Sequence, residues 1–367
     1  MARQLAASAL LPLLRTLGDG RWHSGEVLAG DAGITRAALS KRVQKLLAWG
    51  LEIETQPGRG LRLLAPMELL DADLIRGALP EGTLDSRIRG NDAIQFKSLA
   101  ITVLPSTDST NTQLMAASVA DDPQALLAEH QSAGRGRHGR AWHSPFGANL
   151  YLSLAWSFPQ WPASLTALPL AVGVATARAL EELQVPGLRL KWPNDLWCGD
   201  AKLGGILIEQ RGEAGGACRV VIGLGLNVAM RSATSAHIGR PWTTLADALG
   251  RVAGVNEKTS MPPAFAHGAA PSRNALASAI LREWMVMLAR FAHEGFAPFE
   301  PQWRALDLLR SRSVTVQRAG GDVTGIARGV DETGALLVDA EGGRQRVMSG
   351  EVELRVIPST HVDVPHA

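Results

Sequence analysis

GRGRHGR, residues 134–140, places three arginines among glycines in a chain whose net charge is only +2. Glycine lets the backbone approach a ligand, and arginine offers a planar charged fork that matches phosphate and carboxylate oxygens. The stretch also fits the dinucleotide fingerprint GxGxxG, which requires a following helix and an acidic residue about 20 positions on. Pro145 and Gly147 follow instead, and the first acidic residue after the loop is Glu181, too far along the chain for this fingerprint. We therefore predict an anion-binding loop outside any Rossmann fold, with an ordinary basic surface turn as the alternative.

Length and composition indicate a globular protein of two or three domains. The chain has 367 residues and 46% hydrophobic content, and no apolar run approaches the roughly 20 residues of a membrane span. Leucines near the N-terminus fit a buried first helix better than a signal peptide, so we predict a cytoplasmic protein without membrane association. The two cysteines form no CxxC motif, and His130, His138 and His143 lack acidic or thiolate neighbours at ligand spacing. No metal site made by a side-chain cluster is predicted.

Residues 1–66 are predicted to fold as a winged helix-turn-helix. Ser24 and Thr35 are typical helix caps, the second helix covers 36–49, and strands at 51–55 and 61–64 flank a QPGRG turn. We expect one buried face on the second helix, made by Leu39, Val43, Leu46 and Leu47. The segment has nine basic and five acidic residues, and its second helix has no acid. This charge favours DNA over a protein partner, the alternative for this fold. The predicted DNA-binding residues are Thr35, Arg36, Ser40, Lys41, Arg42, Lys45 and Arg59.

The rest of the chain divides into a connector and two further domains. Residues 67–98 are predicted as one helix (67–79) followed by a linker, and 99–310 as a mixed, mainly antiparallel α+β domain. Within that domain we expect a helix through 113–120, a turn at Asn194 and Asp195, and a mobile insertion at 251–275. Residues 276, 280, 284, 287 and 291 are expected to form a buried helical stripe. Five short strands within 311–356 predict a small SH3-like β-barrel, and 357–367 a tail.

Several motifs together resemble the biotin–protein ligases, in particular those that also repress a biotin operon. The motifs are STN (109–111), Gln131 before AGRGRHGRAW (133–142), SPFGANLYLS (144–153), KWPNDL (191–196), KLGGILIE (202–209), GLGLN (223–227) and PWTTLADAL (241–249). Lipoate ligases share the fold but lack the pair of GRGRxGR and KWPND. The resemblance implies a class II synthetase-like central domain. It covers most of the chain but not 80–97, 251–275 or the last dozen residues.

The resemblance implies an activity in two steps. Family members join the biotin carboxylate to the α-phosphorus of ATP and then pass biotin from the adenylate to a lysine of a carrier protein. Two anions must meet in the first step, which requires fixed positive charge and usually Mg²⁺ with the ATP. The implied catalytic residues are Lys202, Arg137 and Arg140. The implied biotin-binding residues are Ser109, Thr110, Asn111, Gln131, Arg135, Gly136, Arg137 and Lys202. The implied ATP- and adenylate-binding residues are Arg135, Arg137, Arg140, Trp142, Lys191, Asn194, Lys202, Asn227 and Trp242.

The same resemblance implies the partners and leaves alternatives open. The partners are a biotin carboxyl carrier protein of acetyl-CoA carboxylase, operator DNA, and a second copy of the chain in an adenylate-promoted homodimer. A biotin-sensing regulator without turnover and a ligase without DNA binding are the competing readings. Trp142, Trp192 and Leu207 fit the ligand-binding pocket or the core equally well. His138 stands where close relatives often have a fourth arginine, which puts retention of the adenylate in question.

Overall fold

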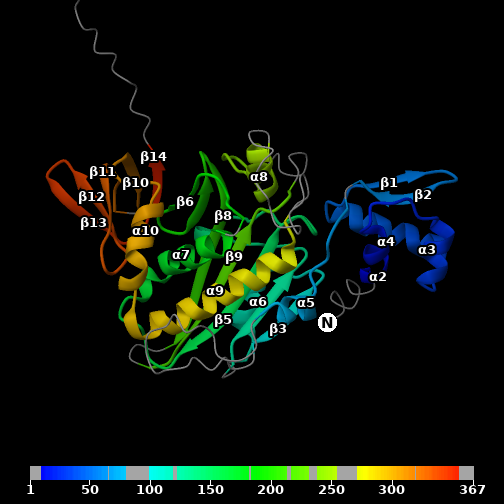
Figure 1. Ribbon diagram of the computed structural model, residues 1–367, viewed down its shortest axis with the longest axis horizontal. Coiled ribbons are helices and arrows are strands. Elements are labelled where there is room, and N and C mark those ends of the chain that lie inside the picture. Colours follow the sequence, from blue (N-terminus) through cyan, green and yellow to red (C-terminus); the bar gives the residue numbers. More distant parts are fainter. Residues whose placement is uncertain are drawn as a thin grey trace, which may run out of the picture.

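The structure is a computed structural model that describes residues 10–64, 66–79, 99–118, 122–181, 183–212, 216–230, 238–253, 271–318 and 320–354. Three helices and a hairpin come first among the described residues, at one end of the molecule (Figure 1). They are α2 (Leu11–Leu17), α3 (Gly25–Asp31), α4 (Arg36–Ala48), β1 (Ile53–Gln56) and β2 (Gly60–Leu63). We call this group the N-terminal module.

Side-chain caps determine where α3 and α4 begin. Ser24 Oγ accepts a hydrogen bond from Glu26 N at 3.3 Å, and Thr35 Oγ1 accepts one from Ala38 N at 3.2 Å. Both predicted caps are confirmed, and each satisfies a backbone donor that the first helical turn leaves free. The prediction for α4 is wrong at Leu47, which is 39% exposed while the other three predicted core residues are buried. At 3.6 residues per turn, Leu47 lies about 80° around the helix from Leu39.

A seven-stranded sheet forms the centre of the molecule, in the order β3-β4-β5-β9-β8-β7-β6. Only β3 and β4 pair in parallel, and every other neighbouring pair is antiparallel, so the predicted mixed sheet is confirmed. The strands are β3 (Ala100–Leu104), β4 (Gln124–Ala128), β5 (Leu150–Phe158), β6 (Leu188–Lys191), β7 (Asp195–Cys198), β8 (Ala201–Gly212) and β9 (Cys218–Leu226).

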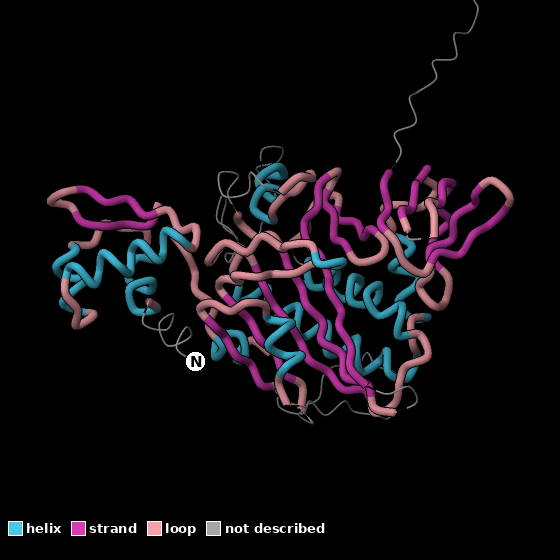
Figure 2. The backbone as a smooth tube through the Cα atoms, turned by 180° about the vertical axis from the view of Figure 1, so that it is seen from behind, coloured by secondary structure: helices cyan, strands magenta, loops and turns pink. Residues whose placement is uncertain are grey.

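Helices cover both faces of this sheet. On one face lie α7 (Leu168–Glu181) and α9 (Arg273–Glu294), in front of the strands in Figure 1. The predicted stripe of α9 is fully buried, which confirms it as core. On the other face, α6 (Thr110–Ala116) packs Leu114 against Leu126, Ala155 and Val221. Figure 2 views the molecule from that side. Trp142 lies on the same face, over Gly225 of β9.

The connector and α6 differ from their predicted extents. Only Ala72–Gly77 forms a helix (α5) within 67–79, because the Asp71 side chain accepts from Asp73 N and Leu74 N and so fixes the first turn. Just before it, Leu70 N donates to the buried Glu129 carboxylate at 2.6 Å instead of to a helical carbonyl. Helix α6 already begins at Thr110 and ends at Ala116, where Ala117 is extended.

Both ends of the predicted insertion at 251–275 belong to helices. Helix α8 (Leu245–Ala253) covers its first residues, and α9 begins at Arg273, whose side chain is buried against Glu129 at 2.6 Å. Residues 254–270 lie outside the described residues, as do 80–98 and the tail from 355. Two 3₁₀ turns, Leu165–Ala167 and Ala297–Phe299, and helix α10 (Glu300–Leu306) complete the central region.

A second, five-stranded antiparallel sheet ends the described chain, in the order β13-β12-β11-β10-β14. Its strands are β10 (Ser313–Gln317), β11 (Val323–Val330), β12 (Leu336–Ala340), β13 (Gly343–Val347) and β14 (Glu351–Leu354). This C-terminal sheet and the N-terminal module lie at opposite ends of the central sheet (Figure 1). Within the described ranges, none of the helices has both the length and the apolar character that a membrane crossing needs.

Candidate ligand-binding site

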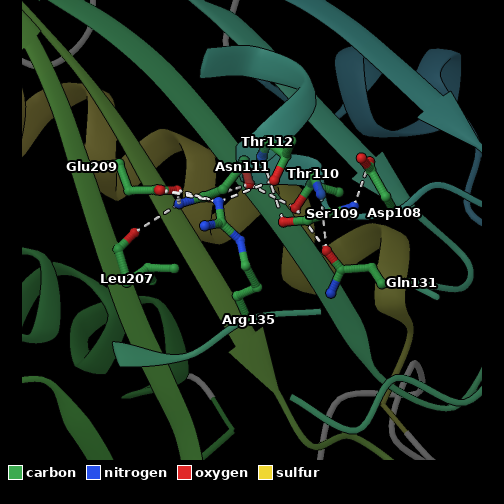
Figure 3. Close-up of polar contacts among 10 residues, drawn as sticks. Asp108, Ser109, Thr110, Asn111, Thr112, Gln131, Arg135, Leu207 and Glu209 are labelled. Carbon is green, nitrogen blue, oxygen red and sulfur yellow. Dashed lines mark hydrogen bonds and ion pairs between the residues drawn. The ribbon is translucent and has the colours of Figure 1, made fainter. Parts of the chain in front are cut away.

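The N-terminus of α6 holds the predicted STN motif against the central sheet (Figure 3). Ser109 caps the helix, and Thr110 donates from both N and Oγ1 to Gln131 Oε1, at 2.9 and 3.2 Å. Ser153 Oγ on β5 lies 2.7 Å from Thr110 Oγ1 and 2.6 Å from Asn111 Oδ1. Thr110, Asn111 and Gln131, predicted from two separate motifs, are therefore linked to Ser153. Ser153 ends the SPFGANLYLS motif but was not among the predicted site residues.

Glycines let other groups lie directly on the strands here. A Cβ on Gly223 would stand 2.2 Å from Asn111 Oδ1, and one on Gly225 would stand 2.3 Å from Trp142 Cε2. Real side chains do not approach so closely, so both positions require glycine for packing reasons. The GLGLN motif therefore forms a flat floor beneath α6 and Trp142.

The predicted anion-binding loop forms a short hairpin. Arg135 and Ala141 form an antiparallel bridge, Gly136 N donates to Arg140 O at 2.7 Å, and Trp142 N donates to Gly134 O at 2.8 Å. The 3₁₀ turn Arg137–Gly139 forms its tip, where His138 has a φ of 54°. Histidine is among the residues that enter this left-handed region more readily than most. The hairpin gives the three arginine side chains separate directions.

Each arginine of the hairpin has a different electrostatic neighbourhood. Arg135 pairs with Glu209 at 3.0 Å, and Arg140 pairs with Glu351 of β14, so the C-terminal sheet reaches this loop. Arg137 lies between them, where burial lowers its pKa, which the charges of Asp195 and Glu351 partly restore. Three carboxylates that the sequence analysis did not assign to the site therefore surround the arginines.

Lys202 lies at the other end of the site from Glu209. Its Nζ is 2.6 Å from Asp195 Oδ1, and the two side chains are only 15% and 17% exposed. A bulge in the pairing of β7 with β8 leaves Leu203 out of register beside Lys202. The ammonium lies 5.5 Å from the centre of the Trp142 ring, so the lysine and the end of the loop share one site. Asp195 is the first residue of β7 rather than part of the predicted turn, which covers 192–194.

The other predicted nucleotide-binding residues surround Lys202. Trp242 forms a backbone bridge with Lys202, and Asn227 Nδ2 donates to Thr243 O at 3.1 Å in the same segment. Asn194 Nδ2 donates to Ile206 O at 2.5 Å. Lys191 lies 4.7 Å from the Trp197 ring, and burial lowers its pKa more than the neighbouring Asp195 raises it.

The three residues left undecided between core and pocket have different positions. Trp192 is buried in the core, and its Nε1 donates to Gly334 O of the C-terminal region at 2.9 Å. Leu207 O accepts from Asn111, which places this residue at the site. Trp142 lies over Gly225, and its buried Nε1 has no hydrogen-bond partner within the described part of the chain. An indole N–H in this position is available to a ligand acceptor.

The predicted DNA-binding residues lie apart from this site, on α4 and the β1–β2 hairpin. Thr35, Arg36, Ser40 and Lys41 are exposed, whereas Arg42 and Lys45 are half-buried. Arg36 pairs with Glu26 at 3.1 Å, and Lys45 lies 5.1 Å from the Trp49 ring. Arg59 and Arg62 both lie over Trp22, at 4.9 and 4.8 Å. Arg36, Ser40 and Lys41 are exposed on α4, whereas Leu39, Val43 and Leu46 of the same helix are buried in the core.

Comparisons with known proteins agree with a class defined by a mixed α/β ligand-binding domain and a C-terminal β domain. The Biotin/lipoate A/B protein ligase family matches residues 101–227, and the Biotin protein ligase C terminal domain matches 312–355. The bifunctional ligase/repressor BirA of Escherichia coli is 39% identical over 94% of this chain and 97% of its own length. The chain therefore belongs to the biotin protein ligases and is an enzyme of that kind.

Two further relatives cover less of the chain. The biotin–[acetyl-CoA-carboxylase] ligase of Mycobacterium tuberculosis is 35% identical over 77% of this chain and 98% of its own length. A solved biotin protein ligase from Aquifex aeolicus, in complex with biotin and ATP, matches with a TM-score of 0.55 and 27% identity. It covers 70% of this chain and 98% of its own.

Proposed function

We propose that this ligase activates biotin with ATP, releases pyrophosphate, and transfers biotin from biotinyl-AMP to a lysine of a biotin carboxyl carrier protein. The complex of the Aquifex relative supports biotin and ATP as substrates. The name of the Mycobacterium relative supports a carrier that belongs to acetyl-CoA carboxylase. The observation that carries the proposal is Lys202, held 2.6 Å from Asp195 next to Trp142 and the arginine hairpin.

The charge at this end of the site suits the first step. A carboxylate must attack a phosphorus that carries negative oxygens, so fixed cations that meet the developing charge lower the barrier. Lys202, Arg137 and Arg140 are proposed to supply that charge, and Lys191 to add to it. Lys202 would exchange its contact with Asp195 for the ligand oxygens. Trp142, Asn194, Asn227 and Trp242 are proposed to bind the nucleotide.

The opposite end suits the ring system of biotin. Ser109, Thr110, Asn111, Gln131, Arg135 and Gly136 are proposed to bind it. Their hydroxyl, amide and backbone groups can pair with a ureido ring that has both donors and acceptors. Mg²⁺ is proposed only as an ion that arrives with ATP. Across the described residues, no three His, Cys, Asp or Glu side chains are grouped to hold a metal.

A transfer assay tests the ligase proposal. The protein is incubated with ATP, Mg²⁺, biotin and an apo carrier domain, and the mass of the carrier is measured. We expect the mass increase of one biotinyl group, dependent on ATP. A carrier that stays unmodified under these conditions would favour a biotin sensor that does not turn over.

We also propose that the N-terminal module is a winged helix-turn-helix and that the protein represses a biotin operon, with biotinyl-AMP as corepressor. The relative named ligase/repressor aligns with 94% of the chain, whereas the one named only as a ligase aligns with 77%. The exposed basic surface of α4 supports contact with DNA phosphates. An SH3-like form is proposed for the C-terminal sheet. Because the carrier and an operon are both cytoplasmic in bacteria, the proposal places the protein there.

A homodimer is proposed as the DNA-binding species, because one module reads few bases and two-fold symmetry supplies a second half-site. A gel shift with the promoter of biotin-synthesis genes, with and without ATP and biotin, tests this. We expect a shift that depends on both substrates. Lys41→Ala should weaken DNA binding and lower the slope of log affinity against log salt concentration by about one. If a protein that ligates biotin never retards the promoter fragment, the protein is a ligase that does not bind this DNA.

A further inference from the structure

Glu209, the last residue of the KLGGILIE motif, contacts two residues of the proposed biotin site (Figure 3). It lies on β8 with Gly205 and Leu207 on the same face, because alternate strand residues share a face. Its two oxygens accept from Arg135 Nη2 at 3.0 and 3.2 Å. Oε2 also accepts from Asn111 Nδ2 at 3.0 Å. Its side chain is 27% exposed, so these contacts are sheltered from water on most sides.

The contact with Glu209 determines the orientation of the Asn111 amide. Nδ2 has two hydrogens, and its acceptors are Glu209 and Leu207 O, the latter at 3.2 Å. Oδ1 points instead to Ser153 Oγ at 2.6 Å. The amide nitrogen therefore has no donor left, and the remaining capacity of Asn111 is a lone pair on Oδ1. A ligand N–H fits that capacity, whereas a ligand carbonyl does not.

The same carboxylate determines the position of the Arg135 guanidinium. Nη2 donates both to Glu209 and to Thr112 Oγ1 on α6, the latter at 3.0 Å. Both contacts use Nη2, so they do not occupy the hydrogens on Nε and Nη1. Because the carboxylate balances the guanidinium charge, this end of the site offers directed donors without excess positive charge. The end with Lys202, Arg137, Arg140 and Lys191 has more cations than carboxylates.

We propose that Glu209 is a positioning residue that fixes Asn111 as an acceptor and Arg135 as a donor, so that the uncharged ring of biotin, not its carboxylate, binds at this end. The inference rests on the proposed assignment of biotin to this site. Glu209 acts through Asn111 and Arg135 and takes part in no bond-making step. Its removal should therefore weaken biotin binding and leave the ATP end unaffected.

The test compares Glu209→Gln and Glu209→Ala with the wild-type protein. Biotin binding is measured by calorimetry, and kcat and the KM values for biotin and ATP by carrier biotinylation. We expect Glu209→Gln to raise the Kd and KM for biotin about tenfold, since one charge-assisted hydrogen bond is lost, and Glu209→Ala to raise them further. The KM for ATP, and kcat at saturating biotin, should stay within about twofold. Glu294→Gln, which breaks a similar pair with Arg290 on the surface of α9, is the matched control.

A second measurement separates positioning from support of the fold. In an Arg135→Ala background, Glu209→Gln should add less than about threefold, because part of its effect passes through Arg135. An unchanged biotin KM in both single variants would refute the inference. Parallel rises of both KM values with a lower melting temperature would reduce Glu209 to a structural role. A wild-type protein that does not bind biotin would instead overturn the proposed site.

Discussion

At the scale of single residues, the site depends on which carboxylate each cation meets. Lys202 lies against Asp195, Arg135 against Glu209 and Arg140 against Glu351. Each pair keeps a charged group in one direction. For Lys202 and Asp195, whose side chains are only 15% and 17% exposed, an unpaired charge would also be costly. A ligand anion can replace a carboxylate as partner of the same cation. Position and charge are therefore prepared before the substrates bind.

Lys202→Ala should abolish ligation and leave the fold intact. Loss of one preorganised cation at the reacting phosphate should lower kcat at least about a hundredfold. Carrier biotinylation measures the rate, and circular dichroism measures the melting temperature. Arg304→Ala, which removes one exposed ion pair with Glu300 on α10, is the control and should ligate at the wild-type rate. Turnover near the wild-type rate in Lys202→Ala would mean that another group supplies the charge.

His130 should make stability depend on pH. Burial, and then the charge of His143, lowers the pKa of His130 to about 4 from 6.5. The unfolded chain therefore takes up a proton between these values that the folded protein does not. Stability is fully present above about pH 6.5 and is lost as the pH falls toward about 4, by up to about 3 kcal/mol.

Urea unfolding at pH 7 and pH 5 measures this loss in the wild-type protein and in His130→Phe, which keeps an aromatic ring at the position. We expect the variant to lose less unfolding free energy between the two pH values. Equal losses in the two proteins would assign the pH dependence to other groups.

At the scale of elements, the site exists because α6 and the arginine hairpin rest on strands without side chains in the way. Gly223 and Gly225 face Asn111 and Trp142 at distances that leave no room for a methyl group. A helix terminus and a hairpin, both chemically ordinary alone, are thereby held over β9. The packing of elements, more than any one residue, brings STN and GRGRHGR together.

Gly223→Ala should displace the start of α6. The added methyl would overlap Asn111, and such overpacking costs about 1–3 kcal/mol of unfolding free energy. Because Asn111 also holds Glu209, we expect biotin affinity to fall at least tenfold by calorimetry. Gly250→Ala is the matched control, since a Cβ there, in α8, has no atom within 4 Å. Biotin affinity that survives in Gly223→Ala would show that α6 tolerates the shift.

At the scale of the whole molecule, the end of β4 joins three regions through consecutive residues. Glu129 holds Arg273 of α9 and the backbone of Leu70, while Gln131 binds Thr110 at the ligand site. Between them, His130 stacks on Trp49 of the N-terminal module, with ring centres 5.6 Å apart. Trp49 also stacks on Phe146 at 5.2 Å. Just beyond the end of β4, the residue that follows the proposed DNA-binding helix thus contacts His130, the chain neighbour of Gln131 in the proposed biotin site.

Trp49→Ala should loosen the N-terminal module from the central sheet. Loss of the stacking contacts with His130 and Phe146 should destabilise the packing of the module on the central sheet by about 2 kcal/mol. We expect ligation within about threefold of wild type, but a smaller effect of ATP and biotin on operator affinity in the gel shift. Leu47→Ala changes an exposed residue on the same helix and is the control. If the effect of the two substrates is as large in Trp49→Ala as in wild type, the joint does not carry it.

Local patterns were enough to predict much of this protein. The caps Ser24 and Thr35, the mixed sheet and the buried stripe of α9 follow from hydrogen-bonding capacity and periodicity between near neighbours. Through their resemblance to biotin–protein ligases, the motifs also named candidate site residues, several of which the structure brings together. The prediction for Leu47 was wrong because this residue lies to one side of the buried face of α4. The connector helix is shorter than predicted because the distant Glu129 carboxylate binds Leu70 N and Asp71 then caps the helix.

Tertiary structure alone decided which charges and rings meet. Glu209, Ser153 and Glu351 were not predicted as site residues, and each meets a partner that lies 74, 42 or 211 positions away along the chain, respectively. From sequence alone, Trp49 is predicted only as part of the last turn of a helix. Its contact with His130 exists only in the folded protein. Such contacts depend on strand register and on the docking of one region against another, and those are determined by the packing of the whole chain rather than by any local stretch.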